Sequence, residues 1–252
     1  MRYIVVLTFA LVSTLEADVL LTDAFNGSQL DDSKWNTFTS PSTPAGTSGS
    51  VSVGNDVVTL AHRGTLITKQ DFLGGVDIVG RFRIDGPTER FMVWTRTTGA
   101  STNPWVDQDN GVYFLFQQET YGDTSNHWLG IGEWSVGGLN DPTGSYTSDQ
   151  NCFNSEIATK HNLFIPSNEW IDFRVTDDGY SVALYLNDLL TPALTAASLF
   201  TAGNHISFNN GYGPGNAVSI DSIIVNSVPE PSALSLLAVG LGVLFRRSRK
   251  RD

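Results

Sequence analysis

The sequence predicts an all-β protein, an antiparallel jelly-roll β-sandwich. In about ten short segments, apolar residues alternate with polar ones at a period of two, which is the pattern of half-buried strands. Glycine, proline, asparagine and aspartate separate these segments, and few windows repeat apolar residues at helical spacing. A run of short strands without intervening helices favours a sandwich architecture.

The candidate strands follow one another through the middle of the chain. They are residues 50–61, 64–70, 76–85, 89–98, 111–119, 127–136, 168–178, 180–188, 204–211 and 217–227. The window closest to helical periodicity is 188–200, and Pro192 interrupts it. The Ser/Thr/Pro-rich stretch 39–50 is expected to form a surface loop, so residues 18–227 are predicted to form one domain.

Composition and charge exclude several classes of function. The chain has 252 residues, of which 40% are hydrophobic, and a mean hydropathy of -0.08, which suits a soluble globular domain. Residues 18–227 carry 9 basic and 23 acidic side chains. This charge repels phosphate backbones, so no nucleic acid is expected as a partner. The single cysteine, Cys152, has no histidine close in sequence to activate it and is expected to be a spectator thiol.

Residues 1–17 have the pattern of a secretory signal peptide. Arg2 supplies a positive charge, residues 3–12 are apolar, and Ala17 offers a cleavage site before Asp18. The apolar stretch is too short to span a membrane comfortably. The mature protein is therefore expected to be exported.

Residues 228–252 combine three features in order. The tripeptide Pro229, Glu230 and Pro231 precedes an uncharged run over 232–245, and a basic cluster follows this run. A helix over the run reaches about 21 Å, short of the ~30 Å hydrocarbon core of a bilayer. The basic cluster is expected to stay in the cytoplasm, which leaves the main domain outside.

This tail resembles the PEP-CTERM sorting signal. The resemblance implies that an exosortase, a membrane transpeptidase, recognises the tail and removes or exchanges it. It also implies a transient stay in the inner membrane, followed by a location at the bacterial cell surface or in the extracellular matrix. The alternative is a permanent anchor formed by the short transmembrane helix.

Three blocks of the middle segment resemble concanavalin-like lectin/glucanase sandwiches, including laminin-G-like domains. In the first block Phe25 and Trp35 are expected to be buried, and in the second block Trp170 is expected to lie in the core. The blocks are residues 23–35, 168–188 and 217–227. Together they reinforce the prediction of a jelly-roll sandwich and imply a glycan-related function.

Catalytic members of this fold carry Glu-x-Asp-x-x-Glu on one strand, where alternate residues face the same way. Retaining glycoside hydrolysis needs two carboxyl groups about 5 Å apart. The motif is absent from this chain, so the domain is predicted to be non-catalytic. The alternative is a glycan-active hydrolase or lyase with an atypical acid pair, for which Glu119 and Glu133 are the candidates.

Aromatic residues carry the prediction of glycan binding. Trp128, Gly130, Gly132 and Trp134 are expected to share one face of a strand and to form a shelf about 20 Å long on which sugar rings can stack. The alternative is that the rings fill, inside the sandwich, the space that the glycines leave. The candidate ligand-binding residues are Trp105, Gln117, Asn126, Trp128 and Trp134.

A metal site has weaker support. The four histidines are scattered, without metal-ligand spacing. Asp107, Asp109 and Asn110 form an oxygen-rich stretch of the kind that binds Ca²⁺ in many lectin-like sandwiches. The stretch is not an EF-hand, because Gln118 stands where that loop needs a bidentate glutamate. We predict no cofactor and a polar turn here, with calcium as the alternative.

Together these features predict an exported, non-catalytic surface or matrix protein with an adhesive or glycan-binding role. The expected partners are an exosortase, an extracellular polysaccharide and, through the C-terminal helix before processing, the membrane.

Overall fold

The computed structural model describes the strand-forming part of the chain. The described residues are 17–39, 49–86, 89–99, 111–121, 124–134, 156–200, 202–210 and 217–228. They contain strands and turns but no helix, which confirms the predicted all-β sandwich. The strands lie in one compact unit, Val19–Val228; the remaining residues, 1–18 and 229–252, form a separate unit. The predicted signal peptide, the short C-terminal helix and the Pro-Glu-Pro motif lie outside the described residues.

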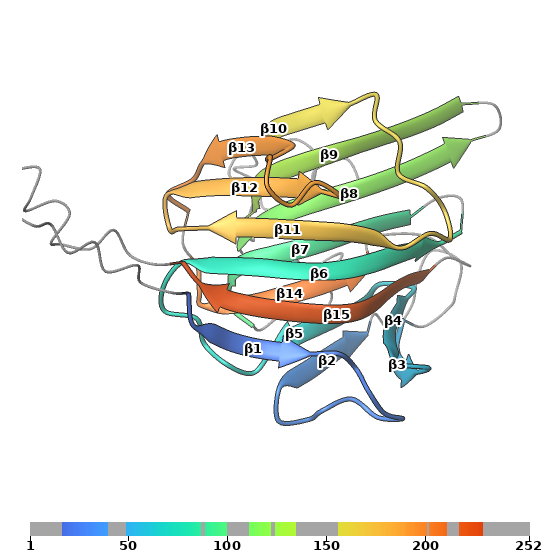
Figure 1. The fold of residues 1–252 in the computed structure, drawn as a ribbon, viewed down its shortest axis with the longest axis vertical. Helices are drawn as coiled ribbons and strands as arrows, with labels where there is room; N and C mark the ends of the chain where they lie inside the picture. Colours follow the sequence, from blue (N-terminus) through green and yellow to red (C-terminus); the bar gives the residue numbers. More distant parts are fainter. Residues whose placement is uncertain are drawn as a thin grey trace, which may run out of the picture. The chain divides into compact units, whose positions relative to one another are not determined.

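The described strands form two antiparallel sheets (Figure 1). Sheet A has the order β13-β12-β11-β6-β15-β4-β3, and β1 also pairs with β15. The strands of sheet A are β1 (Val19–Asp23), β3 (Ser50–Gly54), β4 (Val57–Ala61), β6 (Val76–Asp85), β11 (Ile171–Asp177), β12 (Ser181–Leu186), β13 (Leu194–Ala197) and β15 (Ala217–Ser227).

Sheet B lies behind sheet A in Figure 1 and has the order β10-β9-β8-β7-β14-β5-β2. Its strands are β2 (Trp35–Thr39), β5 (Gly64–Thr68), β7 (Glu89–Thr97), β8 (Gly111–Tyr121), β9 (Thr124–Trp134), β10 (Glu156–His161) and β14 (His205–Asn210). Among the described residues, no helix is long and apolar enough to cross a membrane.

Strands with strong alternation form where the sequence predicts them. The segments 76–85 and 217–227 are β6 and β15 with the predicted bounds. The segment 50–61 is a hairpin of β3 and β4, which turns at Asn55 and Asp56, both with positive φ. The window with the most helical spacing contains instead β13, an edge strand.

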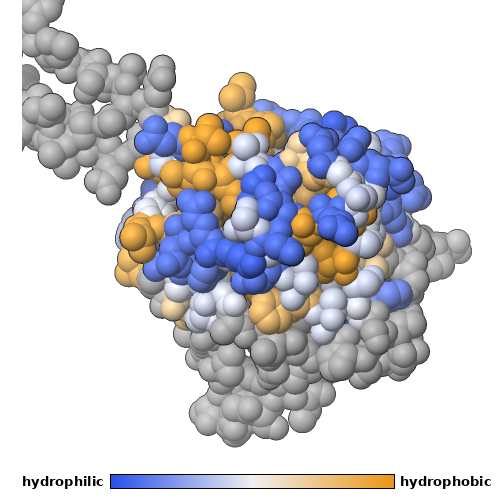
Figure 2. Space-filling view, turned by 90° about the horizontal axis from the view of Figure 1, so that it is seen from below, coloured by the Kyte–Doolittle hydropathy of each residue, from blue (hydrophilic) through white to orange (hydrophobic). Residues whose placement is uncertain are grey.

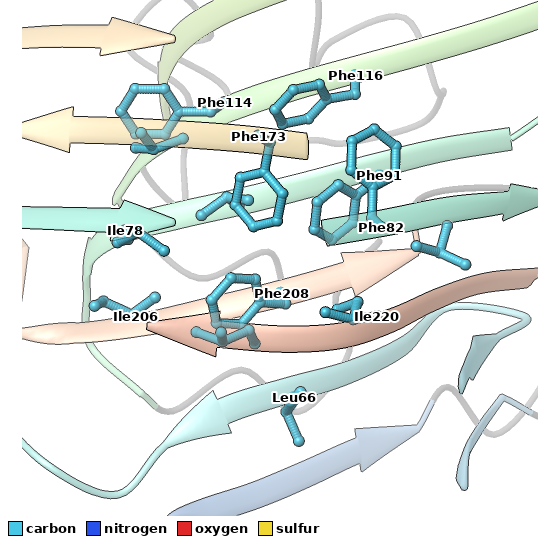
Figure 3. Packing of buried hydrophobic residues seen from close by; sticks show 14 of the residues in the cluster. Leu66, Ile78, Phe82, Phe91, Phe114, Phe116, Phe173, Ile206, Phe208 and Ile220 are labelled. Carbon is cyan, nitrogen blue, oxygen red and sulfur yellow. The ribbon is translucent and has the colours of Figure 1, made fainter. Parts of the chain in front are cut away.

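Aromatic side chains from both sheets fill the centre of the sandwich. Phe82 of sheet A stacks on Phe91 of sheet B with ring centroids 4.6 Å apart, and it lies 4.9 Å from the ring of Phe116. Phe173 meets Phe91 edge-on at 5.4 Å. Figure 3 shows these rings interleaved between the sheets, with Phe208 beside them. Fully buried rings remove a large apolar area from water and so stabilise the fold together with the aliphatic side chains around them.

Of the tryptophans expected to be buried, Trp35 fulfils the prediction. Its ring is 1% exposed, and its indole N–H donates to Asp23 Oδ2 at 2.7 Å. The prediction that Trp170 lies in the core is wrong. Trp170 is half-buried on the outer face of sheet A, where the guanidinium groups of Arg81 and Arg83 lie over its ring at 5.4 and 4.9 Å. These cation–π contacts stabilise an aromatic ring outside a core.

A buried ion pair links the two sheets at one end of the sandwich. Arg96 of β7 and Asp177 of β11 form a two-point ion pair. Nε of Arg96 lies 2.8 Å from Oδ2 of Asp177, and Nη2 donates to Oδ1. Strand alternation alone would place Arg96 on the outer face, beside Trp94 of the same parity. The φ of Arg96 is 56°, which reorients the strand here and brings the guanidinium to Asp177. Thr95 also donates to this carboxylate, at 2.6 Å.

We expect Asp177→Ala to lower the free energy of unfolding by about 3–5 kcal/mol, because the change leaves Arg96 buried without its partner. Chemical denaturation of the variant and the parent measures this difference. The double variant Arg96→Met/Asp177→Leu, which removes both charges, is expected to recover most of the loss. A loss below about 1 kcal/mol for Asp177→Ala would show that this ion pair does not hold the sheets together.

Candidate functional site

The outer face of sheet B, the face that points away from sheet A, carries a second aromatic cluster. On β9, Leu129 and Ile131 belong to the sandwich core, while Trp128 and Trp134 belong to the cluster on the other side. The predicted alternation of this strand therefore places both tryptophans on one face. The cluster consists of Met92, Trp94, Tyr113, Leu115, Trp128 and Trp134, from β7, β8 and β9.

The two glycines of β9 do not leave an empty shelf. Tyr113 pairs with Gly132 across the strands, and a Cβ on Gly132 would overlap the Tyr113 ring. A Cβ on Gly130 would lie 2.8 Å from Oε1 of Glu156. The space beside the tryptophans is thus occupied by a phenol ring and a carboxyl group, and Trp128 and Trp134 are only 8% and 6% exposed.

Glu156, the first residue of β10, places its carboxyl group beside Trp128 of this cluster. Its burial raises its pKa to about 7, and a hydrogen bond from the Trp128 side chain opposes this rise. No described group pairs with Oε1 of Glu156. A carboxyl group that is partly protonated near neutral pH can both donate and accept hydrogen bonds.

Several other polar atoms on this face are buried but have no hydrogen-bond partner among the described residues. They are Thr65 Oγ1, Trp94 Nε1 and Gln117 Oε1. Gln117 stands directly opposite Trp128 in the β8–β9 ladder. Buried polar groups are normally paired, and a cluster of unpaired ones calls for an explanation such as an ordered water or a ligand. Donors and acceptors beside aromatic rings are the groups that hold a sugar.

The side of this face nearest the sheet edge is accessible. His161 and Thr159 of β10 are exposed, and they pair with Trp128 and Gly130 of β9. The His161 ring lies 5.9 Å from that of Trp128. The exposed part of this face therefore lies at the β10 edge, beside Trp128, while the centre of the cluster is closed.

The candidate acid pair is not brought together. Glu119 pairs with Asn126, and Glu133 pairs with Val112, so the two glutamates lie seven positions apart along the β8–β9 ladder. At a strand rise of 3.3 Å, their backbone positions are about 23 Å apart along the ladder. The two carboxyl groups of glycosidases lie only 5–9.5 Å apart. Glu133 also shares strand parity with Ile131, a core residue, rather than with the tryptophans.

Several predicted site residues lie where the structure gives no description. Trp105, Asp107, Asp109 and Asn110 are outside the described residues, as is Cys152; for Asn126 only the strand position is described. The described part of the chain contains no group of three or more His, Cys, Asp or Glu side chains that could hold a metal ion. Gln118, unlike Gln117, is on the core side, where its Nε2 donates to Ser167 Oγ.

Sequence reasoning missed three residues of the site: Trp94, Tyr113 and Glu156. Trp94 and Tyr113 lie in alternating strands. When both faces of a strand are buried, however, the sequence pattern does not tell which face points into the core between the sheets. Glu156 lies on an edge strand, EIATKH, with little apolar alternation. The two glycines of β9 were the available signal, because a strand glycine often marks a close approach by another group.

We expect Glu156→Gln to change how stability depends on pH. Because the pKa is raised in the folded state, protonated Glu156 stabilises the fold fully below about pH 4.5, and this contribution is lost as the pH rises through about 7. The Gln side chain does not ionise, so the variant does not lose this stability as the pH rises. At pH 8 it should be more stable than the parent by about 1–2 kcal/mol, after allowing for a half-exposed group, and equally stable near pH 4.5.

Thermal unfolding between pH 4 and 9 measures this effect. Trp128→Phe serves as a companion variant, because it removes the hydrogen bond that opposes the pKa rise and should move the pH midpoint upward. Parallel pH profiles for the parent and Glu156→Gln would contradict the raised pKa.

Comparisons with known proteins bear on the C-terminal tail and on the sandwich separately. The family model of the PEP-CTERM protein-sorting motif matches residues 227–250. The chain thus carries a PEP-CTERM sorting motif, and such a motif implies export and processing by an exosortase. A comparison with curated proteins found no match.

Solved structures with the same fold include a glycan-bound domain and glycan-cleaving enzymes. One comes from work on endo-acting O-glycanases that members of the human gut microbiota express to initiate mucin breakdown (TM-score 0.57, 12% identity, covering 84% of this chain and 100% of that one). Another is the exoplasmic/lumenal domain of VIP36 bound to Ca²⁺ and Man3GlcNAc (TM-score 0.57, 13% identity, covering 79% of this chain and 87% of that one). A third is the catalytic domain of a laminarinase from Thermotoga petrophila (TM-score 0.53, 13% identity, covering 85% of this chain and 99% of that one). At these identities the likeness establishes the concanavalin-like fold alone.

Proposed function

We propose that this protein is an exported, non-catalytic glycan-binding protein of the cell surface or extracellular matrix, sorted through its C-terminal tail by an exosortase. Its binding site is the β10 side of the outer face of sheet B, around Trp128, Gln117 and Glu156. The role in the matrix is adhesive: the site holds a polysaccharide while the tail determines where the protein is delivered.

The observation that carries this proposal is the set of buried polar atoms beside aromatic rings. Gln117 Oε1 and Glu156 Oε1 are an amide acceptor and a carboxyl oxygen without described partners. Leaving such atoms unsatisfied costs about 1–3 kcal/mol each. The hydroxyl groups of a sugar supply both donors and acceptors, while the aromatic rings pack against its C–H face. The VIP36 domain, which has this fold and is bound to Man3GlcNAc, supports the same ligand class.

The absence of the Glu-x-Asp-x-x-Glu motif supports a non-catalytic role. The residues of β8 that face the cluster are Tyr113, Leu115 and Gln117, none of which is acidic. Of the acidic residues in sheet B with described side chains, Glu156 and Glu133, only Glu156 lies on this face. Hydrolysis by the usual mechanisms needs two carboxyl groups across one glycosidic bond.

The pKa of Glu156 favours a second candidate function, a glycan-active lyase or hydrolase. A carboxyl group with a pKa of about 7 is suited to give or take a proton near neutral pH. In this case Glu156 acts as general acid or base, and a second group that the described residues do not supply completes the chemistry.

A glycan array probed with the protein tests the proposal. We expect binding to at least one class of polysaccharide, and Trp128→Ala should weaken it about tenfold or more, since buried tryptophans are typical binding hot spots. Trp170→Ala is the matched control, because it removes a half-buried tryptophan from the other sheet and should leave binding unchanged. The thermal stability of each variant shows whether it is folded.

The same array separates the two candidate functions. Binding without cleavage, retained in Glu156→Gln, supports the adhesive role, whereas cleavage that Glu156→Gln abolishes supports the enzyme. Binding that survives both Trp128→Ala and Trp134→Ala in folded protein removes the proposed site. No binding to any glycan would contradict a glycan-related function.

A further inference from the structure

Exposed apolar side chains gather at the end of the sandwich where β15 finishes and the chain leaves the described unit at Val228. Leu73 is 87% exposed, Leu199 74%, Val19 63% and Tyr180 59%. We call these four residues the exit-end patch. Figure 1 places the turns that carry them at the left end of the sheets, and Figure 2 shows hydrophobic surface at this end.

Hydrogen bonds and one close backbone approach show that the segments carrying these residues lie together: a Cβ on Gly75 would lie 2.9 Å from the Cα of Asp178, which brings the turn of Tyr180 next to the chain end at Val228. The Val228 N–H donates to the Gly75 carbonyl at 3.0 Å, two residues after Leu73. The backbone carbonyl of Tyr180 accepts from the N–H of Ser198, the residue before Leu199, at 2.8 Å. Val19 pairs with Asn226 near the end of β15. Four separate segments therefore place an apolar residue around the point where the chain leaves the fold.

The length of chain beyond this point identifies what the patch meets. The uncharged run of the sorting tail begins at Ser232, four residues after Val228. Four extended residues span at most about 14 Å. A run held in the bilayer therefore keeps the end of the sandwich at Val228 within about 14 Å of the lipid surface, which makes the exit end the part of the domain nearest to the lipid.

We propose that the exit-end patch rests on the outer surface of the membrane while the sorting tail is still attached. This inference depends on the membrane-inserted tail of the proposed function. Contact with the interfacial region explains why four large apolar side chains are exposed at this end, since amphipathic and apolar side chains favour the headgroup and acyl boundary.

Charge argues that this contact is apolar and not electrostatic. Residues 18–227 are strongly acidic, and the exit end itself carries Asp71 and Asp178. The Asp178 carboxylate accepts from the N–H groups of Tyr180 and Ser181 at 2.9 and 2.6 Å, which fixes the turn that presents Tyr180. Such a surface is not attracted by anionic lipids, so the contact should form equally on zwitterionic bilayers.

Environment-sensitive labels test the proposal in the full chain, reconstituted into vesicles of phosphatidylcholine. Leu73→Cys and Tyr180→Cys, each in a Cys152→Ser background, carry the label at the exit end. Phe164→Cys is the matched control, because Phe164 is 74% exposed and lies in the loop that leads into the start of β11, whereas the exit end lies where β11 finishes. Quenching by lipids with a shallow acyl-chain quencher is compared with quenching by aqueous iodide.

We expect the labels at positions 73 and 180 to be quenched by the lipid and shielded several-fold from iodide, and the label at 164 to behave in the opposite way. Adding Tyr180→Ser and Leu199→Ser should restore iodide access at position 73, which a tether alone would not predict. Equal iodide access at both ends, or shielding that appears only with anionic lipid, overturns the proposal.

Vesicle flotation distinguishes the two possible failures. A full chain that does not float with the vesicles contradicts tail insertion, and hence the sorting route of the proposed function. A chain that floats while its labels at 73 and 180 remain accessible to iodide leaves that route intact and refutes the membrane contact.

Discussion

The antiparallel register of β8 and β9 is the constraint on which both the fold and the candidate site depend. Tyr113 pairs with Gly132, Leu115 with Gly130, and Gln117 with Trp128. The residues between these pairs point the other way and enter the aromatic core. A slip of one position would exchange the two faces, placing Gln117 in the core and Phe116 outside. The tight fit of the Tyr113 ring over Gly132 opposes such a slip, because only glycine leaves room for it.

Sheet B therefore resembles a buried layer more than the half-solvated sheet that simple alternation predicts. Its middle strands are apolar or buried on both faces. For this reason the sequence pattern predicted the existence of β7, β8 and β9 and the common face of Trp128 and Trp134. It could not predict that the glycine gap is filled, because the residues that fill it, Tyr113 and Glu156, come from neighbouring strands.

Edge strands were the part of the fold that the sequence predicted least well. β10 and β13 bury little side-chain area, so selection for alternation is weak there, and β13 lies in the window with the most helical spacing. The misplacement of Trp170 has a related cause. A tryptophan at the start of a strand suggests a core position, yet two arginines of β6 stabilise it outside, and such long-range cation–π contacts leave no trace in local sequence. Glu156 was missed because its raised pKa depends on packing between strands.

The two proposals assign different surfaces of one sandwich to different tasks, and the strand direction makes them compatible. β15 and β9 both finish at the exit end, since Trp134 pairs with Gly111, which lies against Thr95 and Thr97 beside the Arg96–Asp177 ion pair. With that end on the lipid, the strands stand away from the membrane and the outer face of sheet B points sideways. Trp128 precedes the end of β9 by six residues, or about 20 Å. Under the two proposals together, Trp128 stays clear of the bilayer while the tail is attached, whereas Glu156, which pairs with Gly132, lies nearer to the exit end.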